Sequence, residues 1–196
     1  MFIQVIQGKV SDPHHLRRQL ERWRGGVKPG ASGYLGSTGG VTPDGRAITL
    51  VRFESEEAAR ANSERPEQGA WWNEAVKAFD GDVAFYDCRE VDSVLGGGSN
   101  DAGFVQIIQG RAKEQDKMRS RRQELEQQLR QRRPDILGMM VAWHGDGGFT
   151  QVVYFTSQDE ARQKETETEN DELRQEFMSL IDGQPTFFDL TAPDID

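Results

Sequence analysis

Polar and aromatic side chains that could bind a small molecule lie in the first half of the chain. Arg52 follows an apolar stretch, Asn62 comes ten residues later, and Trp71 and Trp72 follow the loop Pro-Glu-Gln-Gly. An amide, two indole rings and a guanidinium offer hydrogen-bond donors, stacking faces and a fixed cation. In an apolar cavity such groups bind an aromatic molecule and stabilise negative charge that develops on it. We therefore predict a ligand pocket formed by Asn62, Trp71, Trp72 and Arg52.

A second polar set occurs twice in the sequence. Gln4 and Asp87 return as Gln106 and Asp189, at positions in otherwise apolar, strand-like segments. Buried polar groups need hydrogen-bond partners. Because the set is present in both halves, we favour a hydrogen-bonded pair that fixes strand register or the interface between sheets, and a role in a pocket is the alternative.

The tryptophans also have a purely structural interpretation. Adjacent residues on a helix point about 100° apart, so at most one of Trp71 and Trp72 faces a given pocket squarely. The other then packs in the core or anchors an interface. Trp23 shares a helical stripe with Leu16 and Leu20, which predicts a core position.

The whole chain repeats itself. FIQVIQG begins at Phe2 and returns as FVQIIQG at Phe104, an offset of 102 residues, and matches continue at this offset through glycines, strand positions and turns. Matches at one constant offset indicate a duplicated folding unit. The glycine-rich segment 93–103 between the copies has the composition of a flexible linker. The predicted domains are therefore 1–92 and 104–196.

Each copy predicts the element order βαββαβ. Alternating segments rich in β-branched residues predict strands, and Ser11 or Asp12 followed by Pro13 predicts the start of a helix that Gly25 and Gly26 end. Ser55 begins a second helix, which breaks near Pro66 before a third. The elements of the first copy are expected at 2–10, 13–24, 34–42, 46–54, 56–62, 70–79 and 82–90, with a hairpin turn at 43–45.

This order predicts an α+β fold made of two tandem ferredoxin-like units. The expected strand order is 4-1-3-2, with helices on one face of each antiparallel sheet. The other apolar face then has to be buried, and two such sheets packed face to face would form an intramolecular dimeric α/β barrel. Such a pseudo-dimer is self-sufficient as a monomer, and further homo-oligomers remain open.

Composition excludes some classes of partner. A formal net charge of -9 and a pI near 4.9 disfavour nucleic acid, and the arginines of 119–133 alternate with glutamates as on a solvated helix face. No apolar run is long enough to span a membrane, and no signal peptide is visible. The single cysteine, Cys88, cannot form an internal disulfide, so we expect a cytoplasmic protein.

The sequence resembles the dimeric α/β-barrel superfamily, and within it the antibiotic biosynthesis monooxygenase (ABM)-like domains. The resemblance rests on the βαββαβ order, on FESEEAARANSERPEQGAWW after the third strand and on the ending FDGDVAFYD. It implies an enzyme that oxygenates an aromatic metabolite without metal, flavin or other cofactor. Non-catalytic binding of a hydrophobic ligand, or a structural scaffold, is the alternative.

The same resemblance disfavours haem degradation. Aligned through Ser55, the tryptophan and axial histidine of the haem-degrading relatives fall at Asn62 and Trp72 of this chain. His14, His15 and His144 lie elsewhere and are expected at the surface, so no metal site is predicted.

The two copies differ most at the predicted pocket. The first has ERPEQGAWWNEA where the second has TETENDELRQEF, with no aromatic residue at the tryptophan positions. We therefore predict that the first copy keeps a pocket and that the second serves mainly as its structural partner.

Overall fold

The chain folds into two compact α+β units. The structure, a computed structural model, describes residues 1–167 and 172–196, with the side chains of 172–174 left out. Unit 1 comprises Met1–Arg89 together with Asp194–Asp196, and unit 2 comprises Glu90–Pro193. Among the described residues, no helix is both long and apolar enough to cross a membrane.

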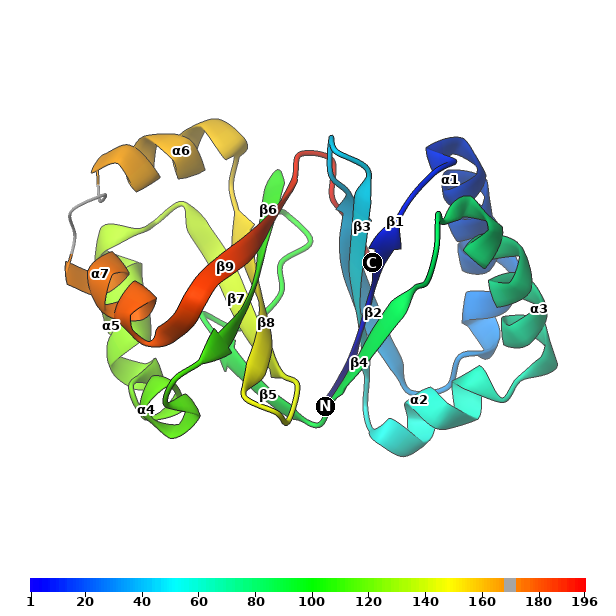
Figure 1. Cartoon of the computed structure of the whole chain (residues 1–196), viewed down its shortest axis with the longest axis horizontal. Coiled ribbons are helices and arrows are strands. Elements are labelled where there is room, and N and C mark those ends of the chain that lie inside the picture. The colour runs from blue at the N-terminus through cyan, green and yellow to red at the C-terminus, as the bar shows by residue number, and fades with distance from the viewer. Residues whose placement is uncertain (168–171) are drawn as a thin grey trace. The chain divides into compact units, whose positions relative to one another are not determined.

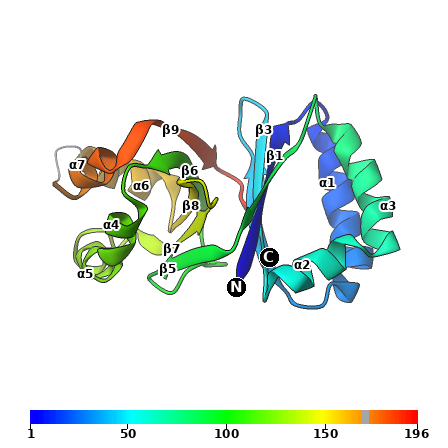
Figure 2. The same ribbon diagram turned by 60° about the horizontal axis from the view of Figure 1, so that its bottom comes forward.

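Unit 1 is a five-stranded antiparallel sheet with helices on one face (Figure 1, Figure 2). The strand order is β10-β2-β3-β1-β4, so the four strands predicted for this unit follow the expected 4-1-3-2 order. Its strands are β1 (Phe2–Lys9), β2 (Tyr34–Val41), β3 (Arg46–Phe53), β4 (Ala84–Cys88) and β10 (Asp194–Ile195). Its helices are α1 (Pro13–Arg22), α2 (Glu56–Ser63) and α3 (Pro66–Ala75), and α1 continues as a π-helical turn, Trp23–Val27.

Unit 2 repeats this arrangement with the strand order β5-β7-β8-β6-β9. Its strands are β5 (Glu90–Val94), β6 (Phe104–Ala112), β7 (Ile136–Trp143), β8 (Gly148–Phe155) and β9 (Ile181–Leu190). Its helices are α4 (Gln115–Ser120), α5 (Arg122–Arg132), α6 (Gln158–Glu167) and α7 (Glu172–Ser179). The prediction of two tandem ferredoxin-like units is confirmed.

Local sequence explains where the helices begin. Asp12 caps α1 by accepting a hydrogen bond from the backbone N–H of His15 at 2.8 Å, and Pro13 occupies the first helical position. Ser55 caps α2 through the N–H of Ala58 at 3.2 Å. The third helix begins at Pro66, four residues earlier than predicted. Proline is favoured in the first turn of a helix, because the backbone N–H groups there form no hydrogen bond within the helix and the absence of one costs nothing.

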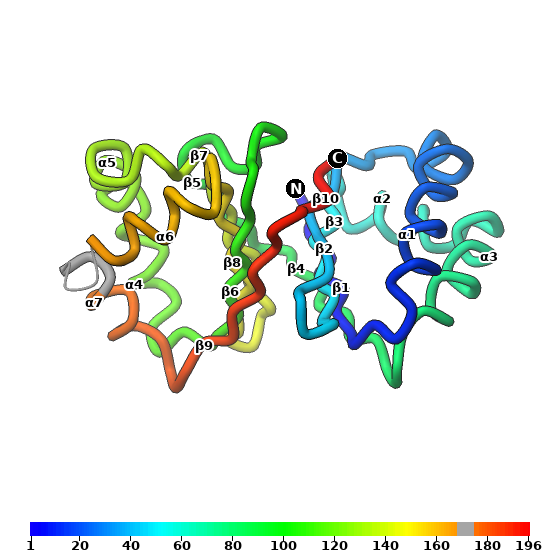
Figure 3. Tube along the Cα trace, turned by 90° about the horizontal axis from the view of Figure 1, so that it is seen from above, coloured from blue at the N-terminus to red at the C-terminus, as the bar shows by residue number. Residues whose placement is uncertain are grey.

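The fifth strand of each sheet was not predicted, and it moves the domain boundaries. The predicted first domain ended at residue 92, but the chain leaves unit 1 at Arg89 and pairs Glu90–Val94 with β7 of unit 2. The predicted linker, 93–103, thus begins inside a strand. At the other end Asp194 and Ile195 pair with β2 of unit 1 (Figure 3). A short edge strand of this kind depends on a partner far along the chain, which local patterns do not reveal.

Two glycines at equivalent positions of the repeat lie in close contact with residues just after these edge strands. A Cβ at Gly138 would overlap the carbonyl oxygen of Gly97, and a Cβ at Gly36 would overlap that of Asp196. The Leu-Gly match between the copies therefore has a steric cause.

Candidate functional site

Both units have a cavity between the sheet and its helices. The cavity of unit 2 measures about 470 Å³ and that of unit 1 about 150 Å³. Their walls use equivalent positions of the repeat, including the pairs Gln4 and Gln106, Ile6 and Ile108, Val51 and Val153, and Phe53 and Phe155. The two units therefore share the position of a cavity as well as a fold.

The larger cavity is in the second copy, which contradicts the predicted asymmetry. Ligand-binding cavities typically measure about 300–1,000 Å³, a range that includes the cavity of unit 2 and excludes that of unit 1. The prediction treated tryptophans as evidence of a pocket, whereas in unit 1 they occupy much of the space that a ligand would need.

One equivalent pair explains much of this difference. Trp23 lines the cavity of unit 1, and Leu125 takes the same place in unit 2. The ring of Trp23 lies 5.0 Å from Tyr34 and 6.2 Å from Trp71, measured between centroids. In unit 2 the position of Tyr34 is held by Ile136. Positions 173 and 174, equivalent to the tryptophan pair, lie outside the described side chains.

Three of the four predicted pocket residues line the small cavity of unit 1. Asn62 is buried on α2, and its Oδ1 accepts a hydrogen bond from Arg65 Nη1 at 2.9 Å. Trp71 is buried and donates its indole N–H to the carbonyl oxygen of Gln19 at 2.7 Å. Trp72 is half-buried and packs edge-on against Phe85. These polar atoms therefore serve internal contacts.

The placement of Arg52 in the pocket was wrong. Val51 and Phe53 line the cavity, so Arg52, between them on β3, points to the opposite face of the sheet. Its Nη2 donates to the carbonyl oxygen of Asp196 at 3.0 Å. The alternation of the strand, followed strictly, would have excluded it.

The repeated polar set forms a hydrogen bond in each unit. Gln4 Nε2 donates to Asp87 Oδ1 at 2.8 Å, and Gln106 Nε2 donates to Asp189 Oδ1 at 2.9 Å. The residues of each pair lie directly opposite each other on neighbouring strands. Both glutamines also line their cavities, so the structural and pocket interpretations apply to the same side chains.

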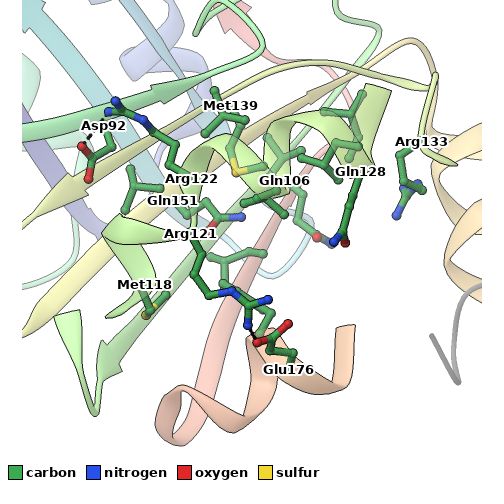
Figure 4. Close-up of a pocket in the computed structure, with 18 of the residues that line it drawn as sticks. Asp92, Gln106, Met118, Arg121, Arg122, Gln128, Arg133, Met139, Gln151 and Glu176 are labelled. Atoms are coloured by element: carbon green, nitrogen blue, oxygen red, sulfur yellow. Dashed lines mark hydrogen bonds and ion pairs between the residues drawn. The ribbon is translucent and has the colours of Figure 1, made fainter. Parts of the chain in front are cut away.

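The floor of the unit 2 cavity contains a second amide, Gln151, which was not predicted from the sequence. Gln151 lies on β8, on the same face as Val153 and Phe155, and only 8% of its surface is exposed. Figure 4 shows Gln106 and Gln151 among the side chains at the centre of this pocket. Strand alternation, Gln-Val-Val-Tyr-Phe, would have placed it on the inner face. The equivalent residue in unit 1 is Thr49.

Ion pairs surround the apolar walls of this cavity. Arg121 pairs with Glu176 of α7, as the dashed line in Figure 4 marks. At another point Asp92 of β5 accepts hydrogen bonds from Trp143 Nε1 at 2.8 Å and Arg122 Nη1 at 3.1 Å. The unpredicted fifth strand thus contributes a buried carboxylate to the site.

None of the three histidines lines either cavity. His14 is exposed, and a ring nitrogen of His15 lies 2.8 Å from the carbonyl oxygen of Glu74. His144 is half-buried rather than at the surface, and burial lowers its pKa. Within the described part of the chain, no three His, Cys, Asp or Glu residues are grouped so that they could hold a metal ion.

The sheet order and the helices on one face of each sheet are those of the ferredoxin-like fold. A ferredoxin-fold protein from Listeria monocytogenes, related to antibiotic biosynthesis monooxygenases, shares this fold. The resemblance found in the sequence is thus confirmed at the level of the fold. Neither a protein-family model nor a curated protein sequence matches the chain.

Three solved structures illustrate the similarity. A candidate monooxygenase from Lactobacillus acidophilus has a TM-score of 0.72 at 12% identity, with 99% of this chain and 98% of that chain covered. Another candidate monooxygenase, from Fusobacterium nucleatum, has a TM-score of 0.75 at 9% identity, with 100% and 93% covered. An anthrone oxidase-like protein has a TM-score of 0.65 at 11% identity, with 99% and 93% covered.

Proposed function

We propose that the protein binds a planar, largely apolar aromatic metabolite in the cavity of unit 2 and oxygenates it without a cofactor. The observation that carries the proposal is the 470 Å³ cavity, whose apolar walls enclose two buried amides, Gln106 and Gln151. The similarity to candidate monooxygenases and to an anthrone oxidase-like protein supports the type of reaction.

The reaction needs a substrate that ionises readily. A deprotonated anthrone transfers one electron to dioxygen, and the resulting radical and superoxide combine into a C–O bond. The peroxide O–O bond then breaks with loss of water and leaves a ketone, so that anthrone and O₂ give anthraquinone and H₂O. The chain would contribute apolar walls that hold the rings, and amide dipoles that stabilise the developing anion.

The carboxylates of the cavity favour binding without catalysis as the second candidate function. Asp92 pairs with Arg122, Asp189 with Arg162 and Glu176 with Arg121. Glu124 and Glu165 are paired with arginines in the same way. The oxygens of these carboxylates are engaged by arginines, so none is positioned as a free general base and deprotonation would depend on the acidity of the substrate itself.

The test substitutes the residue at position 23 or 125, which is tryptophan in the cavity of unit 1 and leucine in the cavity of unit 2. Leu125→Trp should fill the cavity of unit 2, and Trp23→Leu in unit 1 is the matched control. We expect the parent protein to raise oxygen consumption with 1,8-dihydroxyanthrone above the autoxidation rate. Leu125→Trp should reduce this enzymatic rate at least about tenfold, because each 1.4 kcal/mol of lost binding is a factor of ten, and Trp23→Leu should retain it.

The other outcomes separate the candidates. Binding of the anthrone without added oxygen consumption, lost in Leu125→Trp, would establish the binding function and exclude the oxygenase. If the parent protein neither binds the anthrone nor consumes oxygen, or if both variants behave alike, the proposed site is wrong.

A further inference from the structure

We propose that Gln151 selects the ligand, by forming two hydrogen bonds with a planar ring edge that carries a donor and an acceptor side by side, as in a lactam. This inference rests on the proposed function, because it names the ligand chemistry of the same cavity.

The first observation is an unused amide. Gln151 is 8% exposed and lines the cavity, and its side chain forms no hydrogen bond with any residue that the structure describes. The side-chain amide of Gln151 is not among the polar atoms that are cut off from solvent without a partner, so it is open to the cavity. The buried polar groups of native proteins are normally paired, with protein groups or with a bound molecule. A side chain in this state, lining a cavity, indicates a partner supplied by the ligand.

The second observation is the position of Gln151 on the floor. It lies on β8 opposite Ile108 of β6, and Gln106 on the same face pairs with Val153, so the two amides are diagonal neighbours. Diagonal positions across an antiparallel pair are roughly 7–8 Å apart. The Nε2 of Gln106 is engaged by Asp189. Gln151 is therefore the amide that has both its donor and its acceptor free.

The charges around the cavity favour a neutral ligand edge. Arg119, Arg122 and Arg133 are each paired with a carboxylate, Arg119 and Arg122 with Asp92 and Arg133 with Asp135. Arg121 and Arg162 are paired as well. A fully charged group at this edge of the ligand would have to compete with these partners, whereas a neutral amide recognises a neutral ring edge without displacing them.

The chemistry follows from the shape of a carboxamide. Its N–H and C=O lie side by side in one plane, and a cyclic lactam presents the complementary C=O and N–H at the same spacing. The apolar walls then cover the rest of the ring system. A ligand that lacks the donor leaves the carboxamide oxygen unpaired, and a pure hydrocarbon leaves both atoms unpaired.

The experiment compares three probes of similar size: phenanthridinone, N-methylphenanthridinone and phenanthrene. Binding is measured by fluorescence titration of the full-length protein, of Gln151→Met and of the matched unit 1 variant Thr49→Val. Methionine keeps the length and the unbranched shape of glutamine. Since Gln151 has no internal hydrogen bond to lose, the variant should fold, and its phenanthrene affinity reports whether the cavity is intact.

We expect the parent protein to bind phenanthridinone at least about tenfold more tightly than phenanthrene, with the N-methyl compound between them, from two hydrogen bonds of about 1 kcal/mol each. Gln151→Met should abolish this preference while phenanthrene binds as well or better, and Thr49→Val should keep it. Equal binding of the three probes to the parent, or an unchanged preference in Gln151→Met, would overturn the inference and leave the proposed cavity standing. Failure of every probe to bind would overturn both.

Discussion

Trp23 and Leu125 show how the side chain at one equivalent position affects the space left in each cavity. Both stand at the same position of the repeat and both line their cavities, yet the indole in unit 1 packs against Tyr34 and Trp71. An indole fills space that a leucine leaves free, because protein interiors are close-packed. The aromatic residues of unit 1 therefore act as packing, and the cavity persists where the repeat has aliphatic side chains.

Cys88 provides a prediction at the same scale. Burial raises the pKa of its thiol from 9.0 to about 12, and the nearby charge of Asp87 adds to this. Because the thiolate is the reactive form, we expect iodoacetamide to modify Cys88 at pH 8 at least about a hundredfold more slowly in the native protein than in urea. Equal rates would contradict the burial of this thiol.

The raised pKa of Cys88 also links stability to pH. The thiol stays neutral in the folded chain and ionises in the unfolded chain above pH 9.0, its ordinary value. Its contribution to the free energy of unfolding is therefore complete below pH 9 and is lost as the pH rises toward 12.

At the scale of elements, the fifth strands carry equivalent aspartates in unequal surroundings. Asp92 of β5 is buried, and its carboxylate is bound by Trp143, Arg119 and Arg122. Asp194 of β10 occupies the equivalent position in unit 1, where its side chain is 33% exposed and pairs with Arg24. The ion pairs of the edge strand are therefore buried in unit 2 and partly exposed in unit 1.

This difference predicts unequal effects of the same substitution. We expect Asp92→Asn to lower the free energy of unfolding by about 2–3 kcal/mol, because it removes the charge from buried hydrogen bonds. Asp194→Asn should cost less than about 1 kcal/mol, as for other exposed ion pairs. Urea unfolding followed by circular dichroism measures both. Equal losses of unfolding free energy in the two variants would show that the contacts of Asp92 do not hold β5 in the sheet.

At the scale of the whole molecule, the two units have cavities of different volume at equivalent positions. The cavity of unit 1 is about 150 Å³ and that of unit 2 about 470 Å³, although equivalent positions form their walls. The sequence differences at these positions leave more room in the cavity of unit 2 than in that of unit 1.

The capacities predict the stoichiometry of binding. We expect isothermal titration with a three-ring aromatic probe to give one molecule bound per chain, since, of the two cavities in the described part of the chain, that of unit 2 reaches the usual size of a ligand site and that of unit 1 does not. Leu125→Trp should reduce the stoichiometry toward zero, and Trp72→Phe in unit 1 should leave it at one. Two equivalent binding events per chain would contradict the assignment of the site to unit 2.

The sequence by itself determined the fold of each unit. The matches at an offset of 102 residues, a helix cap at Ser11 or Asp12, a second cap at Ser55 and the strand alternation predicted the order of the four main strands of each sheet correctly. These features depend on local conformation and on one apolar face per element. The same alternation also predicts that Gln151 points into its cavity and that Arg52 points to the opposite face of its sheet.

Only the tertiary structure decided where the fifth strands pair and which cavity is open. β5 and β10 are short, and their partner strands lie far along the chain, so no local signal marks them. The cavity depends on how Trp23, Tyr34 and Trp71 pack together in space. A sequence shows that aromatic residues are present, but whether they surround a space or fill it is settled by side-chain packing across several elements.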